Sequence, residues 1–202
     1  MVEKEKLIIN EDYTLENGVL KIFEGVLHIP SFAFSCNRDI QSIILPSTLI
    51  SIGKSAFSFC RNLTGTIIIP DFVKYILDSS FNDCKINKIV LGKNVTYIWT
   101  DSFKSNTLTE IENHSDKIKL INYHAFMDNK EFNKFILNNN NVYIIDPFKD
   151  TNIGYNWDDW AKMCKLNRGN EVLKNTKICT ADTPDNYTFE DGILKIKDGV
   201  EV

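Results

Sequence analysis

The five cysteines are the residues of this sequence best suited to chemistry, because thiols ligate metals, form disulfides and act as nucleophiles. Cys36, Cys60 and Cys84 recur every 24 residues, two or three positions after a phenylalanine. Metal sites usually combine closer ligand pairs with histidine, and the sequence has no C-x-x-C motif. We therefore interpret these three thiols as a column in the structural core, one per repeat. Cys164 and Cys179 could form a disulfide, and the sequence leaves that open.

The three histidines, His28, His114 and His124, lie at unrelated positions of the repeat described below. A Ser-His-Asp or Cys-His arrangement needs a histidine beside a nucleophile, and no pattern in the sequence provides one. The glycine-rich motifs G-x-x-x-x-G-K-[ST] and G-x-G-x-x-G, which hold nucleotide phosphates, are also absent from the sequence. We interpret the histidines as surface or turn residues. The sequence predicts no catalytic site, no metal site and no cofactor.

The amino-acid composition further narrows the class of protein. The chain has 202 residues, of which 43% are hydrophobic, so wholesale disorder is excluded. The net charge is −4, from 23 basic and 27 acidic residues, which does not indicate a nucleic-acid partner. No apolar run approaches the ~18 residues of a membrane span, so we expect no membrane insertion. The first residues lack an apolar stretch of signal-peptide length, and the compartment is left open.

The elements that position these residues are internal repeats. Six phenylalanines recur every 22 to 24 residues: Phe34, Phe57, Phe81, Phe103, Phe126 and Phe148. A second register opens short apolar stretches at Ile40, Leu63, Ile86, Leu108 and Phe132. A third register consists of apolar pairs three residues apart: Val26/Ile29, Leu49/Ile52, Val73/Ile76, Val95/Ile98 and Ile118/Ile121. Three registers that keep phase over five units predict one repeated structural unit.

The repeat has the physics of a solenoid. A unit of about 23 residues is too short to bury its own apolar face, so neighbouring units stack and share one core. The β-branched stretches IILP, IIIP and IVLG favour strands that pair in parallel with their equivalents. Pro46, Pro70 and Gly92 are expected to end these strands. Each phenylalanine is expected to fill the core opposite the strand.

This unit resembles the leucine-rich repeat of the BspA-like, or treponemal, type. The resemblance is carried by IILPSTLISIGKSAFSFCRNL (Ile43 to Leu63) and IIIPDFVKYILDSSFNDC (Ile67 to Cys84), and it covers roughly residues 20 to 150. It implies a right-handed leucine-rich-repeat array of about five to six coils, which we class as an α+β or β-rich solenoid. It also implies a surface or secreted binding protein, with a role in adhesion, and no shared enzymatic chemistry.

The two ends of the chain repeat each other. Residues 1–26 contain alternating apolar residues around Asn17-Gly18, which predicts a β-hairpin cap for the array at 27–150. Residues 151–185 are expected to be a distal capping segment with a short helix near 156–166 and a linker. Residues 186–202 are a second copy of the hairpin, offset by 174 positions. Either this copy begins a further array, or it covers the last repeat or an edge of a neighbouring molecule.

Two surface patterns are candidate binding sites. Along the repeated strand, the outward positions are Ile44, Ile68, Val90, Glu112 and Ile136, four of them aliphatic. The second pattern is aromatic and comprises Tyr75, Tyr97 and Trp99. The alternatives are that the aliphatic residues stabilise stacked strands or are covered in an oligomer, and that the aromatic residues cover the core edge.

From these patterns we expect a non-enzymatic binding module that presents an extended surface to a protein or glycan partner. The alternative is a structural element that joins repeat arrays end to end, with self-association through residues 186–202. An enzyme is the weakest hypothesis, because no polar cluster is visible at one level of the coil.

Overall fold

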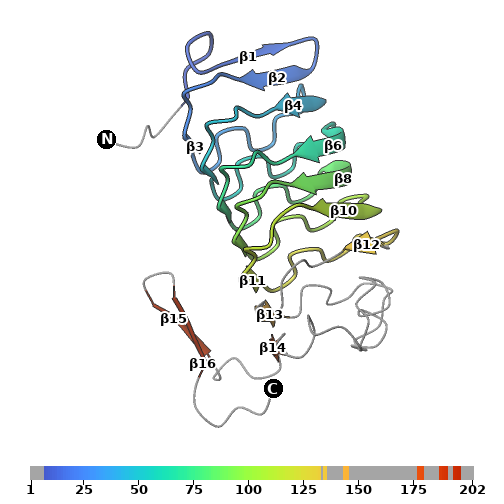
Figure 1. Cartoon of the computed structure of the whole chain (residues 1–202). Helices are drawn as coiled ribbons and strands as arrows, with labels where there is room; N and C mark the ends of the chain where they lie inside the picture. The colour runs from blue at the N-terminus through green and yellow to red at the C-terminus, as the bar shows by residue number, and fades with distance from the viewer. Residues whose placement is uncertain are drawn as a thin grey trace.

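The chain winds into coils that stack in sequence order, each coil contributing two short strands (Figure 1). The structure is a computed structural model that describes residues 7–132, together with the strand backbones at 134–135, 143–145, 177–179, 187–190 and 193–196. The strands are β1 (Tyr13–Glu16), β2 (Val19–Ile22), β3 (His28–Ile29), β4 (Ser42–Ile44), β5 (Ser51–Ile52), β6 (Thr64–Ile68), β7 (Tyr75–Ile76), β8 (Lys85–Leu91), β9 (Tyr97–Ile98), β10 (Glu110–Asn113), β11 (Leu120–Ile121), β12 (Lys134–Phe135), β13 (Tyr143–Ile145), β14 (Lys177–Cys179), β15 (Tyr187–Glu190) and β16 (Ile193–Ile196).

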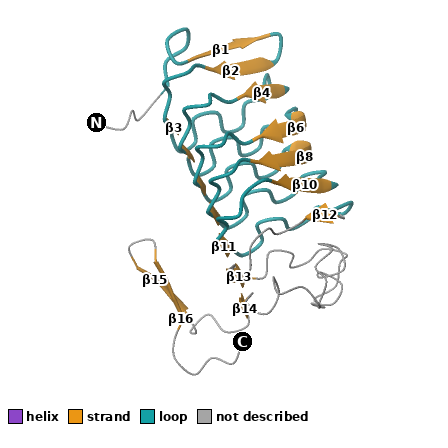
Figure 2. Cartoon of the chain, in the orientation of Figure 1, coloured by secondary structure: helices purple, strands orange, loops and turns teal. Residues whose placement is uncertain are grey.

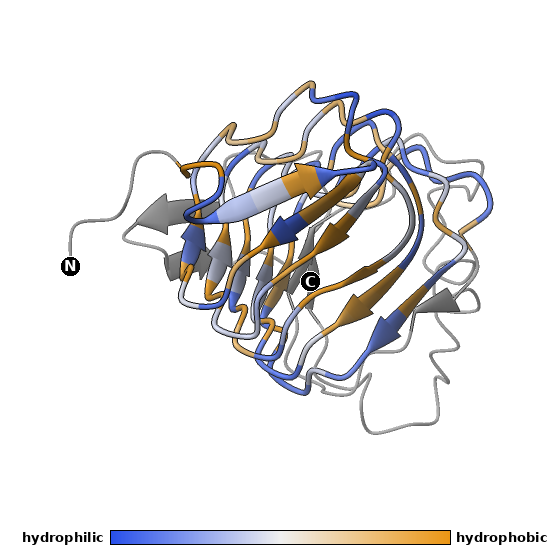
Figure 3. Ribbon diagram, turned by 90° about the horizontal axis from the view of Figure 1, so that it is seen from above, coloured by the Kyte–Doolittle hydropathy of each residue, from blue (hydrophilic) through white to orange (hydrophobic). Residues whose placement is uncertain are grey.

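Equivalent strands of successive coils pair in parallel and line two sides of the stack. One side is a seven-stranded sheet in the order β3-β5-β7-β9-β11-β13-β14. The other side consists of β2 and β4, followed by the sheet β6-β8-β10-β12. A view down the stack shows the described coils lying over one another, with strands on two sides (Figure 3). The predicted solenoid is confirmed.

The helical part of the predicted fold class needs correction. Strands, turns and loops account for the described residues, and none of them is helical (Figure 2). The reason is the shortness of the repeat: two strands and the turns that join them use up each coil, which leaves no segment for a helix. The helix predicted near 156–166 lies outside the described residues.

The third side of the stack consists of turns around a column of phenylalanine rings. Phe57, Phe81, Phe103 and Phe126 are fully buried, and Phe34 is buried at the first coil. The rings stack face to face, with centroids 5.1 to 5.8 Å apart and interplanar angles of 4° to 11°. Such offset stacks add about 0.5–1.5 kcal/mol per pair to the burial of the rings. Phe148 lies outside the described residues.

The turns hold the column with a repeated backbone conformation. The residues two before and two after each phenylalanine have positive φ in every described coil, for example Ser79 (56°) and Asp83 (53°) on either side of Phe81. Between them the Phe81 amide donates to the carbonyl of Ser102 in the next coil at 2.8 Å. The same bond recurs from Phe34, Phe57 and Phe103. All of these amides donate toward the next coil, so the hydrogen bonds along the turn side run in one direction.

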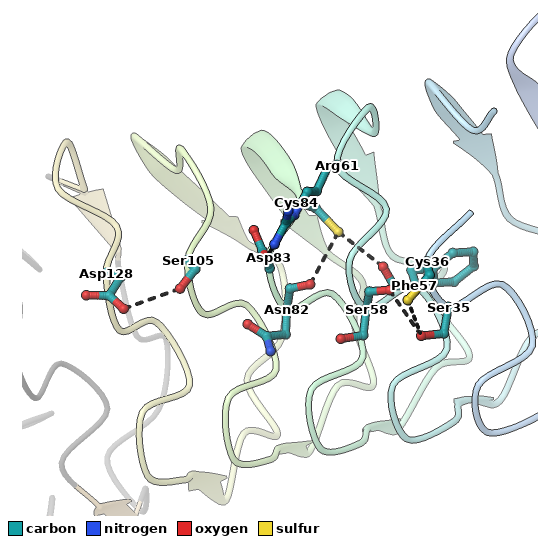
Figure 4. Close-up of polar contacts among 10 residues, drawn as sticks. All are labelled: Ser35, Cys36, Phe57, Ser58, Arg61, Asn82, Asp83, Cys84, Ser105 and Asp128. Atoms are coloured by element: carbon teal, nitrogen blue, oxygen red, sulfur yellow. Dashed lines mark hydrogen bonds and ion pairs between the residues drawn. The ribbon is translucent and has the colours of Figure 1, made fainter. Parts of the chain in front are cut away.

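The cysteine column requires a correction at its first member. Cys60 and Cys84 are buried, but Cys36 is exposed. Cys60 and Cys84 follow their phenylalanines by three residues, whereas Cys36 follows Phe34 by two. That shift places Cys36 at one of the positive-φ turn positions, where side chains leave the core. The buried thiols donate across the stack, Cys84 Sγ to the carbonyl of Phe57 at 3.2 Å (Figure 4).

Asparagines continue the column where the cysteines stop. Asn106 and Asn129 also follow a phenylalanine by three residues, and both are buried. Asn106 Nδ2 donates to the carbonyl of Phe81 at 2.7 Å, and its Oδ1 accepts from the amide of Ile86 at 3.1 Å. Asn129 repeats this pattern one coil later, with Leu108 as the donor. The distal coils therefore keep the polar ladder with a different residue.

The N-terminal hairpin extends the first coil. β1 and β2 pair antiparallel around Asn17 and Gly18, which both have positive φ (49° and 79°), as a type I′ turn requires. β2 then pairs in parallel with β4 of the second coil. Leu20 is fully buried, and the ring of Tyr13 meets Phe34 edge-on with centroids 5.1 Å apart. The hairpin thus covers the otherwise open edge of β4.

Candidate functional site

The aliphatic positions on the strand side form a row that is exposed in the first coils. We call Ile44, Ile68, Val90 and Glu112 the strand-face row. Ile44 and Ile68 are 51% and 65% exposed, Val90 is half-buried and Glu112 is exposed. Ladder partners join Ile68 to Val90 and Val90 to Glu112. Ile136, the predicted continuation, lies outside the described residues.

The distal part of this face is charged and internally paired. Lys88 Nζ lies 2.6 Å from Glu110 and 2.8 Å from Glu112, and Glu112 also contacts Nε2 of His114 at 2.8 Å. Hydrogen bonds from Lys88 first, and then from His114, lower the pKa of Glu112. The two carboxylates raise the pKa of Lys88. These side chains satisfy one another, so this part of the face offers few unpaired charges to a ligand.

The proximal part of the face carries few charges, and Lys21 on β2 is its exposed ladder partner to Ile44. Ser42 on β4 and Thr64 and Thr66 on β6 are exposed beside Ile44 and Ile68. A partner that covers Ile44 and Ile68 removes mainly apolar atoms and neutral hydroxyl groups from water, with the ammonium of Lys21 beside Ile44. This region is suited to a partner with a mainly apolar contact surface.

The predicted aromatic pattern lies on the other sheet. Tyr75 on β7 and Tyr97 on β9 are ladder partners, and their rings stack with centroids 5.5 Å apart at 4°. Trp99 follows, 6.5 Å from Tyr97 at 34°. Tyr75 is exposed, whereas Tyr97 and Trp99 are half-buried. Because the rings cover one another's faces, Tyr75 is the member with most surface free for a ligand.

Phe72 connects the two candidate surfaces, and the sequence patterns did not single it out. It is 62% exposed in the turn between β6 and β7, so one coil exposes Ile68, Phe72 and Tyr75 in succession. In each coil this turn position precedes a buried residue of the third register. The other coils carry small or polar residues there, namely Gly25, Thr48, Asn94 and Lys117. The signal was therefore present as a break in the repeat.

Two further exposed phenylalanines lie on the turn side, and these too were not predicted. Phe32 and Phe59 occupy positive-φ positions, at 60° and 61°. The other described coils place serine, cysteine, aspartate or histidine at these positions. The guanidinium of Arg61 lies 5.7 Å from the Phe59 ring centroid, and Arg61 pairs with Asp83 of the next coil (Figure 4).

The histidines lie on separate parts of the stack. His28 Nδ1 is 2.8 Å from Ser51 Oγ at the β3–β5 end of the seven-stranded sheet. His114 pairs with Glu112 after β10, and His124 Nδ1 lies 3.6 Å from Asp101 on the turn side. Within the described part of the chain, no three histidine, cysteine or carboxylate side chains are placed to hold a metal ion. No helix of that part has the length and apolar character needed to cross a bilayer.

Comparison with known proteins agrees with this architecture. The model of the BspA type leucine-rich repeat region, in six copies, matches residues 27–153, more than half of the chain. The chain belongs to the BspA-type leucine-rich repeat family. This membership supports a repeat-based scaffold for binding or structure. A search of curated proteins finds no match.

Two solved structures of bacterial leucine-rich repeat proteins resemble this BspA-type chain. One, from Eubacterium ventriosum, is 21% identical with a TM-score of 0.51, and the match covers 92% of this chain and 45% of that one. The other, from Bacteroides ovatus, is 22% identical with a TM-score of 0.47, over 69% of this chain and 49% of that one. The first likeness supports the fold. The present chain matches about half the length of each.

Proposed function

We propose that this BspA-type chain is a non-enzymatic binding module whose contact surface is the proximal part of the strand face, around Ile44 and Ile68. The observation that carries the proposal is the pair Ile44 and Ile68, which stay more than half exposed on adjacent coils although the repeat buries most of its other strand isoleucines. Phe72 extends the apolar surface around the corner of the third coil. A rigid stack holds these side chains in fixed positions, so a partner meets a preorganised surface.

The chemistry of this surface favours a protein partner over a glycan. Ile44 and Ile68 offer apolar area, and the exposed hydroxyl groups of Ser42 and Thr66 offer only single hydrogen bonds. Glycans present many hydroxyl groups and need correspondingly many polar partners. An apolar protein surface with a polar rim fits the arrangement better.

The test compares two isoleucine pairs. The full chain is screened against a protein array and a glycan array, and the bound partner is titrated with the Ile44→Ser/Ile68→Ser variant. Burying each half-exposed isoleucine is worth roughly 1 kcal/mol, so the Kd should rise roughly thirtyfold for the pair. The matched control is Ile8→Ser/Ile9→Ser, because those residues are 45% and 54% exposed but precede the first strand. Equal loss in both variants, or capture by glycans alone, would contradict the proposal.

A further inference from the structure

The hairpin β15–β16 repeats the pairing of the hairpin β1–β2. In the first hairpin Tyr13 faces Ile22 and Glu16 faces Val19. In the second hairpin, Tyr187 faces Ile196 and Glu190 faces Ile193, and the two intermediate pairs correspond as well. Every partner is displaced by the same offset that relates the two copies in the sequence, and the two loop residues change only from Asn17-Gly18 to Asp191-Gly192. Asn-Gly and Asp-Gly are both sequences that favour a type I′ turn.

The residues that seat the first hairpin on the stack recur in the second. Leu20 and Ile22 are buried, Tyr13 packs on Phe34, and the carbonyl of Gly18 accepts from the amides of Gln41 and Ser42 at 2.8 and 3.1 Å. Tyr13, Gly18, Leu20 and Ile22 correspond in sequence to Tyr187, Gly192, Leu194 and Ile196. The second hairpin therefore carries at equivalent positions the residue types that hold the first one on β4.

The second hairpin is a two-stranded sheet that is not paired with any other described strand. Two strands alone are only marginally stable, and an open strand edge is a template for pairing with another chain. In the first hairpin the corresponding edge of β2 is the one that pairs with β4. The complementary surface for β16 is accordingly a strand such as β4.

The chain's own β4 is beyond the reach of this hairpin. β14 lies six ladder steps from β3, which belongs to the same coil as β2, and β1 lies one step further. Seven steps of ~4.8 Å amount to ~34 Å along the stack. Only eight residue steps connect Cys179, at the end of β14, to Tyr187, and they span at most ~29 Å. A hairpin in this position meets the β4 of a second copy more readily than its own.

We propose that β16 pairs in parallel with β4 of a second copy of this chain and replaces that copy's β1–β2 hairpin. Ile193 then lies opposite Ser42, and Leu194 lies opposite Ile43, as Val19 and Leu20 do within one chain. The contact joins the distal end of one chain to the proximal end of the next, so it is head-to-tail. The proposal is independent of the strand-face binding surface.

The resident hairpin competes with the incoming one, because its tether gives it a high effective concentration. Exchange is therefore concentration-dependent, and weakening the resident hairpin increases it. Leu20→Asp on the accepting chain should raise exchange, since Leu20 is fully buried in the wild-type chain. Leu194→Asp on the donating chain should lower it.

Disulfide trapping tests the pairing in the full chain. Cys36, Cys164 and Cys179 are first replaced by serine in every variant. A Ser42→Cys chain is then mixed with an Ile193→Cys chain under oxidising conditions, and inter-chain disulfide is measured on a non-reducing gel. We expect the yield to exceed that of an Ile193→Cys/Leu194→Asp donor at least tenfold. The intra-chain pair Val19→Cys/Ser42→Cys calibrates the yield, because those residues are ladder partners.

Three results would overturn the proposal. One is an inter-chain yield no higher than that of the Leu194→Asp donor. Another is a disulfide that forms only within a chain carrying both Ser42→Cys and Ile193→Cys. The third comes from sedimentation equilibrium without added cysteines: the weight-average mass of the wild-type chain should rise with concentration and that of Leu194→Asp should not, so equal masses would refute head-to-tail exchange.

Discussion

Replacing Asn106 by alanine should destabilise the stack more than any exposed substitution, because this side chain satisfies main-chain groups of two coils. Its Nδ2 donates to the carbonyls of Phe81 and Phe103 at 2.7 and 3.1 Å, and its Oδ1 accepts from the amide of Ile86 at 3.1 Å. Asn106 itself is buried. Alanine leaves at least the Ile86 amide and the Phe81 carbonyl unsatisfied, at about 1–3 kcal/mol each. The expected loss in the free energy of unfolding is therefore about 2–6 kcal/mol.

The Asn106→Cys variant separates the effect of the hydrogen bond that Asn106 donates from the effect of the one that it accepts. In the equivalent position of the preceding coil, Cys84 Sγ donates to the carbonyl of Phe57. A thiol at 106 should therefore restore the bond to Phe81 but not the acceptor for Ile86. We expect stability in the order wild type, Asn106→Cys, Asn106→Ala, measured by urea unfolding followed by circular dichroism. Equal stabilities of the two variants, or a loss below about 0.5 kcal/mol for alanine, would refute the ladder as a source of stability.

Two other predictions concern the polar and thiol groups. Lys88 and His114 lower the pKa of Glu112, so the stability that this carboxylate contributes is present above the ordinary carboxyl pKa and is lost as pH falls through the lower folded value. The difference in thermal midpoint between wild type and Glu112→Gln should therefore shrink between pH 7 and pH 3. A constant difference would contradict the ion-pair assignment. Burial raises the pKa of Cys60 to about 11, whereas Cys36 is exposed. Brief treatment of the native chain with iodoacetamide should therefore alkylate Cys36 well before Cys60 and Cys84, as measured by peptide mass spectrometry. Equal rates would show that the thiol column is open to solvent.

The periodic features of this fold could be predicted because each depends on a phase that recurs. The phenylalanine spacing predicts the ring column, and Asn17-Gly18 predicts the first hairpin turn. The same reasoning gives a wrong prediction for Cys36. It places Cys36 in the core because Cys36 and Cys60 are evenly spaced, although Cys36 is one residue closer to its phenylalanine than Cys60 is. A one-residue difference around the turn moves a side chain from the interior to solvent, and the slightly variable repeat length of this sequence hides such a difference.

The polar ladder was not predicted because it depends on hydrogen-bonding chemistry rather than on residue class. Cysteine and asparagine look unrelated in a sequence, yet Cys84 and Asn106 both donate to the carbonyl of a phenylalanine one coil back. Phe72 looks like another apolar repeat residue until its turn is located. The two predicted surfaces could not be placed relative to each other either, since the strand-face row and the Tyr75–Tyr97 pair belong to different sheets.

The one-way orientation of the amides on the turn side restricts how such a protein can change its length. In each coil the same main-chain amides donate to carbonyls of the next coil, as those of Phe57, Phe81 and Phe103 do. When one complete coil is removed or duplicated, the coils that become neighbours still present matching hydrogen-bond donors and acceptors to each other. A deletion of half that length would set strands against turns and leave both unbonded. Evolution and protein engineering alike should therefore lengthen or shorten this molecule in whole-turn increments.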